Sequence, residues 1–312
     1  MKVIVLGGGD SPEREVSLRS ARAVCQALRK KKNEVFFLDP LAGSFFKKLL
    51  QVKPDCVFIA LHGGMGEGGV IQGLLESLGF PYTGSGVLAS AVCLNKLVAK
   101  KILAYHGLPT PAFVPVNNGW LPEKMALSLP VVVKPASLGS TIGISIVKSK
   151  HRLSQAVKKA LIYDREVFLE QYISGVEIAA SILGNNPPVC LPVIEIKTAG
   201  GFYDYQSKYT PGGSLHTIPP GISKESLQKV TSLATRTFQT LGCRDLARID
   251  MIVDSQGNPW ILDINTIPGF TQTSLYPDAA RAAGIEFEEL CQKLVLWAKE
   301  RKQPGKSHGR QK

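Results

Sequence analysis

Short apolar runs alternate with amphipathic stretches through the first part of the chain. Three of the apolar runs have the composition of strands buried on both faces: 2–6, 35–38 and 56–61. Four apolar residues between the first two runs recur at helical spacing: Ala21, Val24, Cys25 and Leu28. A further amphipathic stretch, 70–78, ends at Gly79 as a helix would. This alternation predicts an α/β fold in which a parallel sheet carries helices on both faces.

Strand patterns dominate after segment 107–111, where a helix that begins near Asn95 is expected to end. Strands are expected at 131–134, 144–148, 167–171 and 177–183. Helices are expected at 153–163, 224–241 and 286–299. Segment 198–221 is rich in Gly, Tyr, Thr and Pro and has little periodicity. We interpret it as a long loop of the kind that closes over active sites.

A predicted hairpin carries the clearest chemical signal. Strand patterns at 248–253 and 260–265 flank the turn sequence Ser-Gln-Gly-Asn. Because side chains alternate along a strand, each strand places two polar residues on one face: Arg248 with Asp250, and Asp263 with Asn265. Apolar residues are expected on the opposite face: Ile249, Met251, Ile261 and Ile264. Three oxygen ligands beside a guanidinium favour a Mg²⁺ or Mn²⁺ site, and a solvated sheet face is the alternative.

Two other polar segments follow predicted strands. Lys134 precedes the small-residue loop 135–143, whose backbone N–H groups suit phosphate oxygens, although an ordinary hairpin loop is equally compatible. His62 opens a glycine-rich segment at the carboxyl end of a parallel strand, where ligands bind in such folds. Glu13 follows the glycines after the first strand and occupies a similar place.

Composition and charge narrow the class of protein. The 312 residues are 44% hydrophobic and 20% charged, as in globular proteins. No apolar run approaches the roughly 18 residues of a membrane span, so we expect a cytoplasmic protein with no membrane partner. Much of the net charge of +12 lies after residue 299 and at 29–32, and nucleic acid is not an expected partner. The glycines at 7–9 do not fit a dinucleotide motif, and the dispersed cysteines suggest no zinc site.

Seven segments in order give the chain a specific resemblance. They read LGGGDSPEREVSL, HGGMGEGGVIQGLLE, PYTGSGVLASAVCLNK, VVVKPASLGSTIG, FYDYQSKYTPGG, ARIDM and DINTIPGFTQTSL. From about residue 2 to residue 298 the chain resembles the D-alanine–D-alanine ligases of the ATP-grasp superfamily. The resemblance implies a Rossmann-like domain followed by a two-lobed α+β ATP-grasp domain and a basic tail. The implied boundaries are 1–94, 95–183 (central lobe), 184–298 (C-terminal lobe) and 299–312.

The same resemblance implies ATP-dependent ligation of two D-alanines through a D-alanyl phosphate, for peptidoglycan precursor synthesis. Glu13 matches the carboxylate that holds the ammonium group of the first D-alanine, and His62 lies beside that position. Ser140 and Tyr209 match hydroxyls that link to Glu13 and orient the lid. The family is usually dimeric, so a homodimer is expected.

Further matches concern the second substrate and the tetrahedral intermediate. Arg248 and the backbone N–H of Gly269 match the groups that stabilise the oxyanion. Ser274 and the N–H of Leu275 match the site for the second carboxylate.

The resemblance also assigns residues to ATP and metal. Phosphate contacts are implied for Lys96, Lys134 and Lys208. Contacts to adenine and ribose are implied for Glu170, Tyr172, Ile173, Glu177, Phe202 and Leu262. The ligands of two Mg²⁺ or Mn²⁺ ions are implied to be Asp250, Asp263 and Asn265.

Several positions depart from the family pattern. Asp263 stands where a glutamate usually bridges the metal ions, and it is one methylene shorter. Gly68, Leu138 and Asn95 stand where acidic residues are common. Two alternatives therefore stay open besides the D-alanine ligase: a ligase that takes D-lactate or D-serine second, and a nucleotide-binding protein without activity. The Lys208–Tyr209 pair favours D-alanine over D-lactate.

Overall fold

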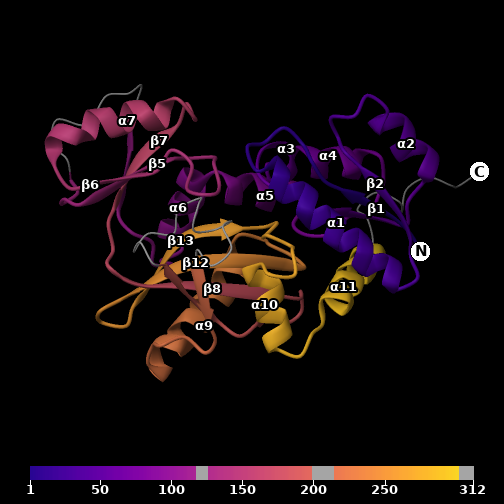
Figure 1. Ribbon diagram of the computed structural model, residues 1–312. Helices are drawn as coiled ribbons and strands as arrows, with labels where there is room; N and C mark the ends of the chain where they lie inside the picture. The colour runs from indigo at the N-terminus through magenta and orange to yellow at the C-terminus, as the bar shows by residue number, and fades with distance from the viewer. Residues whose placement is uncertain (117–125, 199–213, 302–312) are drawn as a thin grey trace, which may run out of the picture.

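A parallel three-stranded sheet forms the centre of the N-terminal domain. The computed structural model describes residues 1–116, 126–198 and 214–301. The sheet order is β2 (Glu34–Leu38), β1 (Lys2–Leu6) and β3 (Cys56–Ile59). The helices of this part are α1 (Arg14–Lys30), α2 (Phe45–Val52), α3 (Gly64–Glu67), α4 (Val70–Ser77) and α5 (Val87–Leu94) (Figure 1).

Both faces of this sheet are buried, as the apolar runs predict. Val3 and Val5 pack with α1 and with the last helix, α11 (Phe287–Glu300). Ile4 and Leu6, which alternate with them, pack with α2 and α4 on the other face. The predicted α/β arrangement, with helices on both faces of a parallel sheet, is therefore confirmed.

An antiparallel sheet of four strands forms the next part of the chain, which begins after α6 (Lys96–Tyr105). Asn95 caps α6 by accepting a hydrogen bond from the Val98 N–H at 3.1 Å. The sheet order is β4 (Phe113–Val116), β7 (Val167–Gln171), β5 (Val131–Pro135) and β6 (Ser145–Val147). A short 3₁₀ turn, Lys150–Arg152, leads into α7 (Leu153–Leu161), which packs on the sheet.

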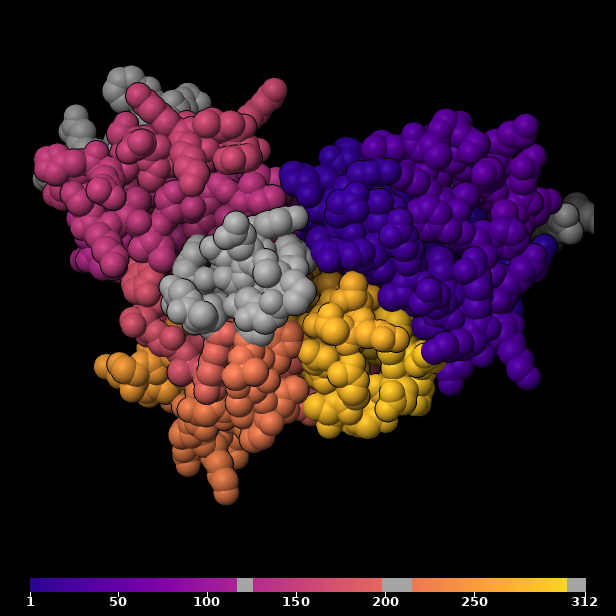
Figure 2. All heavy atoms as spheres, viewed as in Figure 1, coloured from indigo at the N-terminus to yellow at the C-terminus, as the bar shows by residue number. Residues whose placement is uncertain are grey.

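The largest sheet belongs to the C-terminal lobe and is antiparallel throughout. Its order is β11 (Ser214–Thr217), β10 (Ile194–Thr198), β8 (Gly175–Leu183), β12 (Leu246–Asp254) and β13 (Pro259–Asn265), with β9 (Val189–Cys190) paired to β8. α9 (Lys224–Thr240) covers one face, and α10 (Leu275–Ala282) packs on the other. As predicted, Ser223 caps α9 and Gly242 follows its end with φ +66°. Figure 2 shows this lobe in orange and yellow beside the indigo N-terminal domain.

One expectation about the C-terminal part needs correction. Residues 214–217 form β11 rather than loop, because their backbone pairs with β10 in antiparallel register. Residues 199–213 of the expected loop lie outside the described part of the chain. The domain boundary at residue 183 stays a prediction; β8, which ends at this residue, pairs with β12 along its whole length. No helix in the described residues has the length and apolar character needed to cross a membrane.

Candidate active site

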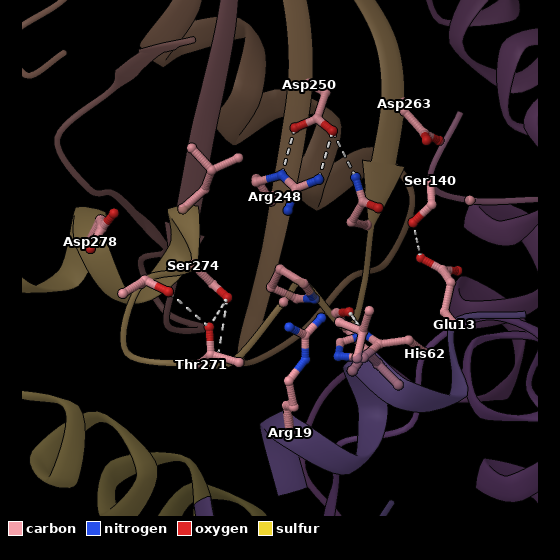
Figure 3. Close-up of a pocket in the computed structure, with 18 of the residues that line it drawn as sticks. Glu13, Arg19, His62, Ser140, Arg248, Asp250, Asp263, Thr271, Ser274 and Asp278 are labelled. Carbon is pink, nitrogen blue, oxygen red and sulfur yellow. Dashed lines mark hydrogen bonds and ion pairs between the residues drawn. The ribbon is translucent and has the colours of Figure 1, made fainter. Parts of the chain in front are cut away.

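A cavity of about 610 Å³ lies where the N-terminal domain, the loop after β5 and the β12–β13 hairpin meet. Ten residues that the sequence analysis singled out line it: Glu13, His62, Ser140, Arg248, Asp250, Asp263, Asn265, Gly269, Ser274 and Leu275. They come from segments far apart in the chain, and Figure 3 shows most of them around one opening. The structure therefore brings together the catalytic, substrate and metal candidates among its described residues.

Glu13 is held at the start of α1 by contacts with the loop after β5. The Ser140 hydroxyl donates a hydrogen bond to Glu13 Oε1 (Figure 3). A Cβ atom at Gly139 would lie 2.7 Å from Glu13 Oε2, so a side chain at this position would force the Glu13 carboxylate to shift. Ser140 itself has φ +53°, a left-handed conformation that L-residues rarely adopt. Strain of this kind is concentrated at functional sites.

His62 connects two segments of the cavity wall. Burial lowers the pKa of its imidazole, so the ring is neutral at physiological pH. Nδ1 donates to the Ile267 carbonyl oxygen at 3.1 Å, and Nε2 therefore accepts from the Ser20 hydroxyl at 3.0 Å. The Ser20 oxygen in turn accepts from the Phe270 N–H at 3.3 Å. These bonds fix the loop that carries Gly269.

Replacing Ser20 with alanine should lower kcat about tenfold and the free energy of unfolding by about 1 kcal/mol, because one buried hydrogen-bonded group is lost. Steady-state kinetics and urea denaturation measure the two effects. Ser77→Ala removes an exposed hydroxyl and serves as the control. A Ser20→Ala protein with unchanged kcat would show that the loop does not depend on Ser20.

Glu67 lies beside His62, with 4.0 Å between its Oε1 and the imidazole Nδ1. Burial raises the pKa of the Glu67 carboxyl from 4.5 to about 8, and the negative charge of Glu13 adds to the effect. The folded protein therefore binds this proton at neutral pH, whereas the unfolded chain releases it. The sequence analysis did not single out Glu67 for a role.

The Glu67 carboxyl should make the protein less stable as pH rises. Between pH 4.5 and about 8 the folded state binds one more proton than the unfolded state, so the free energy of unfolding falls with pH. Glu67→Gln should remove this part of the pH dependence, and Glu15→Gln, on the exposed side of α1, should not. Urea denaturation of the unchanged protein and the two variants, at pH values between 4.5 and about 8, measures the slope of the unfolding free energy with pH. Equal slopes in all three would disprove the assignment.

The predicted hairpin is present, and its register brings the polar faces of the two strands together. Arg248 pairs with Asn265, and Asp250 pairs with Asp263, so the four polar side chains share one face. The apolar residues named for the opposite face are buried in one cluster. Ile261 lies two residues before Asp263, and simple alternation would place both side chains on the same face. A β-bulge between them shifts the register, so Ile261 is buried in the core instead.

Each of the two hairpin carboxylates proposed as metal ligands contacts a cation. The Arg248 guanidinium donates to both oxygens of Asp250, at 2.7 and 2.8 Å, and Asn265 Nδ2 donates to Asp250 Oδ2 at 3.0 Å. Asp263 lies 3.0 Å from Lys96 Nζ. Among the described residues no group of three or more His, Cys, Asp or Glu side chains is placed to hold a metal ion. Two carboxylates and an amide oxygen nevertheless form a donor set that suits Mg²⁺ or Mn²⁺.

The residues expected to bind nucleotide form a second group, and none of the described ones lines the cavity. Glu170 on β7 is buried and forms ion pairs with Lys134 on β5 and with Lys100 on α6. The other described members lie at the start of α6, after the end of β7, on β8 and at the bulge of β13: Lys96, Tyr172, Ile173, Glu177 and Leu262. Phe202, Lys208 and Tyr209 lie outside the described residues.

The far end of the cavity is formed by the start of α10. The Ser274 and Thr271 hydroxyls lie 2.8 Å apart, and the Thr271 N–H donates to Ser274 Oγ at 3.1 Å. Eight polar residues of the wall were not predicted from the sequence: Arg19, Glu67, His216, Thr271, Gln272, Thr273, Asp278 and Arg281. Asp278 accepts from Arg281 three residues later, which is a helical spacing that a sequence can show.

Comparison with known proteins agrees with this geometry. Residues 102–296 match the family described as D-ala D-ala ligase C-terminus, and residues 42–85 match D-ala D-ala ligase N-terminus. The D-alanine–D-alanine ligase of Pelotomaculum thermopropionicum is 51% identical over 310 residues, which cover 96% of this chain and 97% of that protein. The D-alanine–D-alanine ligase of Carboxydothermus hydrogenoformans is 47% identical, with 97% and 100% covered.

Solved structures give the same result. The crystal structure of D-alanine–D-alanine ligase from Bacillus anthracis superposes with a TM-score of 0.82 at 34% identity, over 96% of this chain and 97% of that one. The structure described as its complex with ATP gives a TM-score of 0.80 at 33% identity, with 96% and 97% covered. Fold and cavity thus place the chain among the ATP-binding ligases. It belongs to the D-alanine–D-alanine ligase family.

Proposed function

We propose that this protein joins two molecules of D-alanine into D-alanyl-D-alanine, with ATP as the source of energy and D-alanyl phosphate as the intermediate. The observation that carries the proposal is the convergence of ten predicted residues on one cavity. The product would serve as a precursor of peptidoglycan. Cytoplasmic location stays a prediction.

The first D-alanine would bind with its ammonium group near Glu13, whose carboxylate Ser140 holds in place. Its own carboxylate attacks the γ-phosphorus of ATP. The bond between that phosphorus and the bridging oxygen of the β-phosphate breaks, ADP leaves, and the acyl phosphate forms. Glu13 thereby fixes the distance between the reacting groups, which is the main way that binding lowers such a barrier.

The second D-alanine would bind with its carboxylate at the Ser274 hydroxyl and the Leu275 N–H, at the positive end of α10. Its amine, after losing a proton, attacks the acyl carbon, and inorganic phosphate leaves. Arg248 and the N–H of Gly269 would donate to the oxygen that becomes negative in the tetrahedral intermediate.

ATP would occupy the region between the two antiparallel sheets. We assign phosphate contacts to Lys96, Lys134 and Lys208, and base or ribose contacts to Glu170, Tyr172, Ile173, Glu177, Phe202 and Leu262. We assign Tyr209 to the lid. Asp250, Asp263 and Asn265 would hold two Mg²⁺ or Mn²⁺ ions, which supply positive charge to the phosphates.

The protein is also proposed to be a homodimer. Two apolar side chains on neighbouring helices are largely exposed, Val70 on α4 at 63% and Leu88 on α5 at 77%. The two helices contact each other, and contiguous exposed apolar surface marks protein interfaces. Light scattering of the purified protein measures its mass and tests this proposal.

A paired assay tests the proposed reaction. The protein with ATP, Mg²⁺ and D-alanine should release one phosphate for each dipeptide formed. D-Lactate or D-serine offered with D-alanine should give little mixed product. Binding of ATP without phosphate release would instead indicate a protein without ligase activity.

A further inference from the structure

Three buried lysines surround two carboxylates beside the proposed nucleotide site. Lys100 Nζ lies 2.7 Å from Glu170 Oε2, and Lys134 contacts Glu170 Oε1. Lys96 is paired with Asp263. With all five groups charged, the cluster carries one excess positive charge. Because an uncompensated buried charge is unfavourable, the cluster favours the binding of an anion.

The two lysines on Glu170 differ in how firmly they are held. Lys100 is 2% exposed and also donates to the Thr110 hydroxyl, which itself donates to the Ile261 carbonyl oxygen at 2.9 Å. Its ammonium lies 5.4 Å from the centre of the Phe113 ring. Lys100 therefore has partners besides Glu170 that fix it.

Lys134 is less enclosed, with 10% of its side chain exposed, and it stands at the end of β5 before the small-residue loop. Its diagonal position to Glu170 in the β5–β7 register explains their contact. Among the described residues its ammonium contacts Glu170 alone. Lys134 is therefore the lysine that can turn to a phosphate.

If Lys134 turned away, Oε1 of the buried Glu170 carboxylate would lose its partner, and Lys100 would remain at Oε2. Burial raises the pKa of Glu170, and the charges of Lys134 and Lys100 outweigh this effect, so that the net pKa lies below its usual value. With Lys100 still bound to Oε2, the carboxylate stays ionised and keeps its orientation. Oε1 is then free to accept a hydrogen bond from the amino group of adenine.

We propose that Lys100 is a positioning residue that stays on Glu170 while Lys134 exchanges this carboxylate for a nucleotide phosphate. The proposal rests on the nucleotide contacts assigned under the proposed function. The exchange couples recognition of the phosphates to recognition of the base. When Lys134 moves from Glu170 to a phosphate, Glu170 Oε1 becomes available to the base. Lys100 thereby contributes to selectivity for a purine with a 6-amino group over one with a 6-oxo group.

The test compares Lys100→Met with Lys101→Met, which removes the same charge from an exposed position on the same helix. Calorimetry with Mg²⁺ and without D-alanine measures the affinity for ATP and for inosine triphosphate, which carries a 6-oxo group. The unfolding midpoint without nucleotide is measured in parallel. These measurements require no dipeptide, so failure of the ligase assay and failure of this proposal are separate results.

Lys100→Met should lower the affinity for ATP about 10-fold to 100-fold, because a buried ion pair that holds Glu170 is lost. The affinity for inosine triphosphate should fall less, so that the ratio between the two nucleotides shrinks. The unfolding midpoint should stay within a few degrees, because Glu170 keeps Lys134 and the buried cluster becomes neutral. Lys101→Met should match the unchanged protein, and Lys100→Arg should recover part of the ATP affinity.

Unchanged ATP affinity in Lys100→Met would overturn the proposal. Equal losses for the two nucleotides would overturn it as well, since they would indicate a general role in packing. If Lys100→Met does not fold, Lys100→Gln, which retains a donor toward Glu170 but no charge, is judged by the same ratio.

Discussion

Substitution of Arg248 by lysine should lower kcat by about 10²–10³-fold while the affinity for ATP changes little. The guanidinium donates two hydrogen bonds to Asp250, and Arg248 lines the cavity. Lysine cannot make a bidentate contact to Asp250 and donate to an oxyanion at the same time. Loss of one oxyanion donor typically has an effect of this size.

Single-turnover kinetics would locate the Arg248→Lys defect. Formation of the acyl phosphate should be less affected than formation of the dipeptide, because the oxyanion develops in the second step. Arg236→Lys, the same change at an exposed position of α9, serves as the control. A variant with near-normal turnover would exclude Arg248 from the oxyanion site.

Substitution of Asp263 by asparagine should lower kcat by about 10³-fold or more. The neutral amide cannot balance the charge of a divalent ion and also leaves Lys96 without its carboxylate partner. A loss of several kcal/mol of charge stabilisation gives this magnitude. Initial rates measured against Mg²⁺ and Mn²⁺ concentration report the effect.

Asp263→Glu should instead be active and should need less Mg²⁺ for half-maximal rate. The longer side chain reaches further from the hairpin, and Mg²⁺ demands short bonds in near-octahedral geometry. Asp254→Asn, near the turn of the same hairpin, should keep the metal dependence of the unchanged protein. An Asp263→Asn protein with that same dependence would show that Asp263 is not a ligand.

Local patterns predicted much of this site because its key features lie within single elements. Alternation along each short strand was sufficient to place Arg248 with Asp250 and Asp263 with Asn265, and the register of the hairpin then brings the two pairs onto one face. The contact between Glu13 and Ser140 was predicted only from the resemblance, because the two residues lie 127 positions apart in the chain. No periodicity specifies a contact of that kind.

Other features depend on packing that the chain pattern does not contain. Lys100 lies one helical turn after Lys96, so the two share a face of α6, but its partner Glu170 arrives on a strand from a different part of the chain. β11 has only four residues and gains its structure by pairing with β10. For this reason the sequence alone predicted a loop at residues 214–217.

The packing of α11 against α1 and β1 affects how the chain folds during synthesis. One face of the first sheet is completed by α11, residues 287–300, which are synthesised after the two antiparallel sheets that follow this domain in the chain. Until α11 is made, Val3, Val5 and the apolar side of α1 lack its cover, although domains usually fold in order from the N-terminus. A chain cut before Phe287 would expose this surface, and the N-terminal domain would become the part most prone to aggregation.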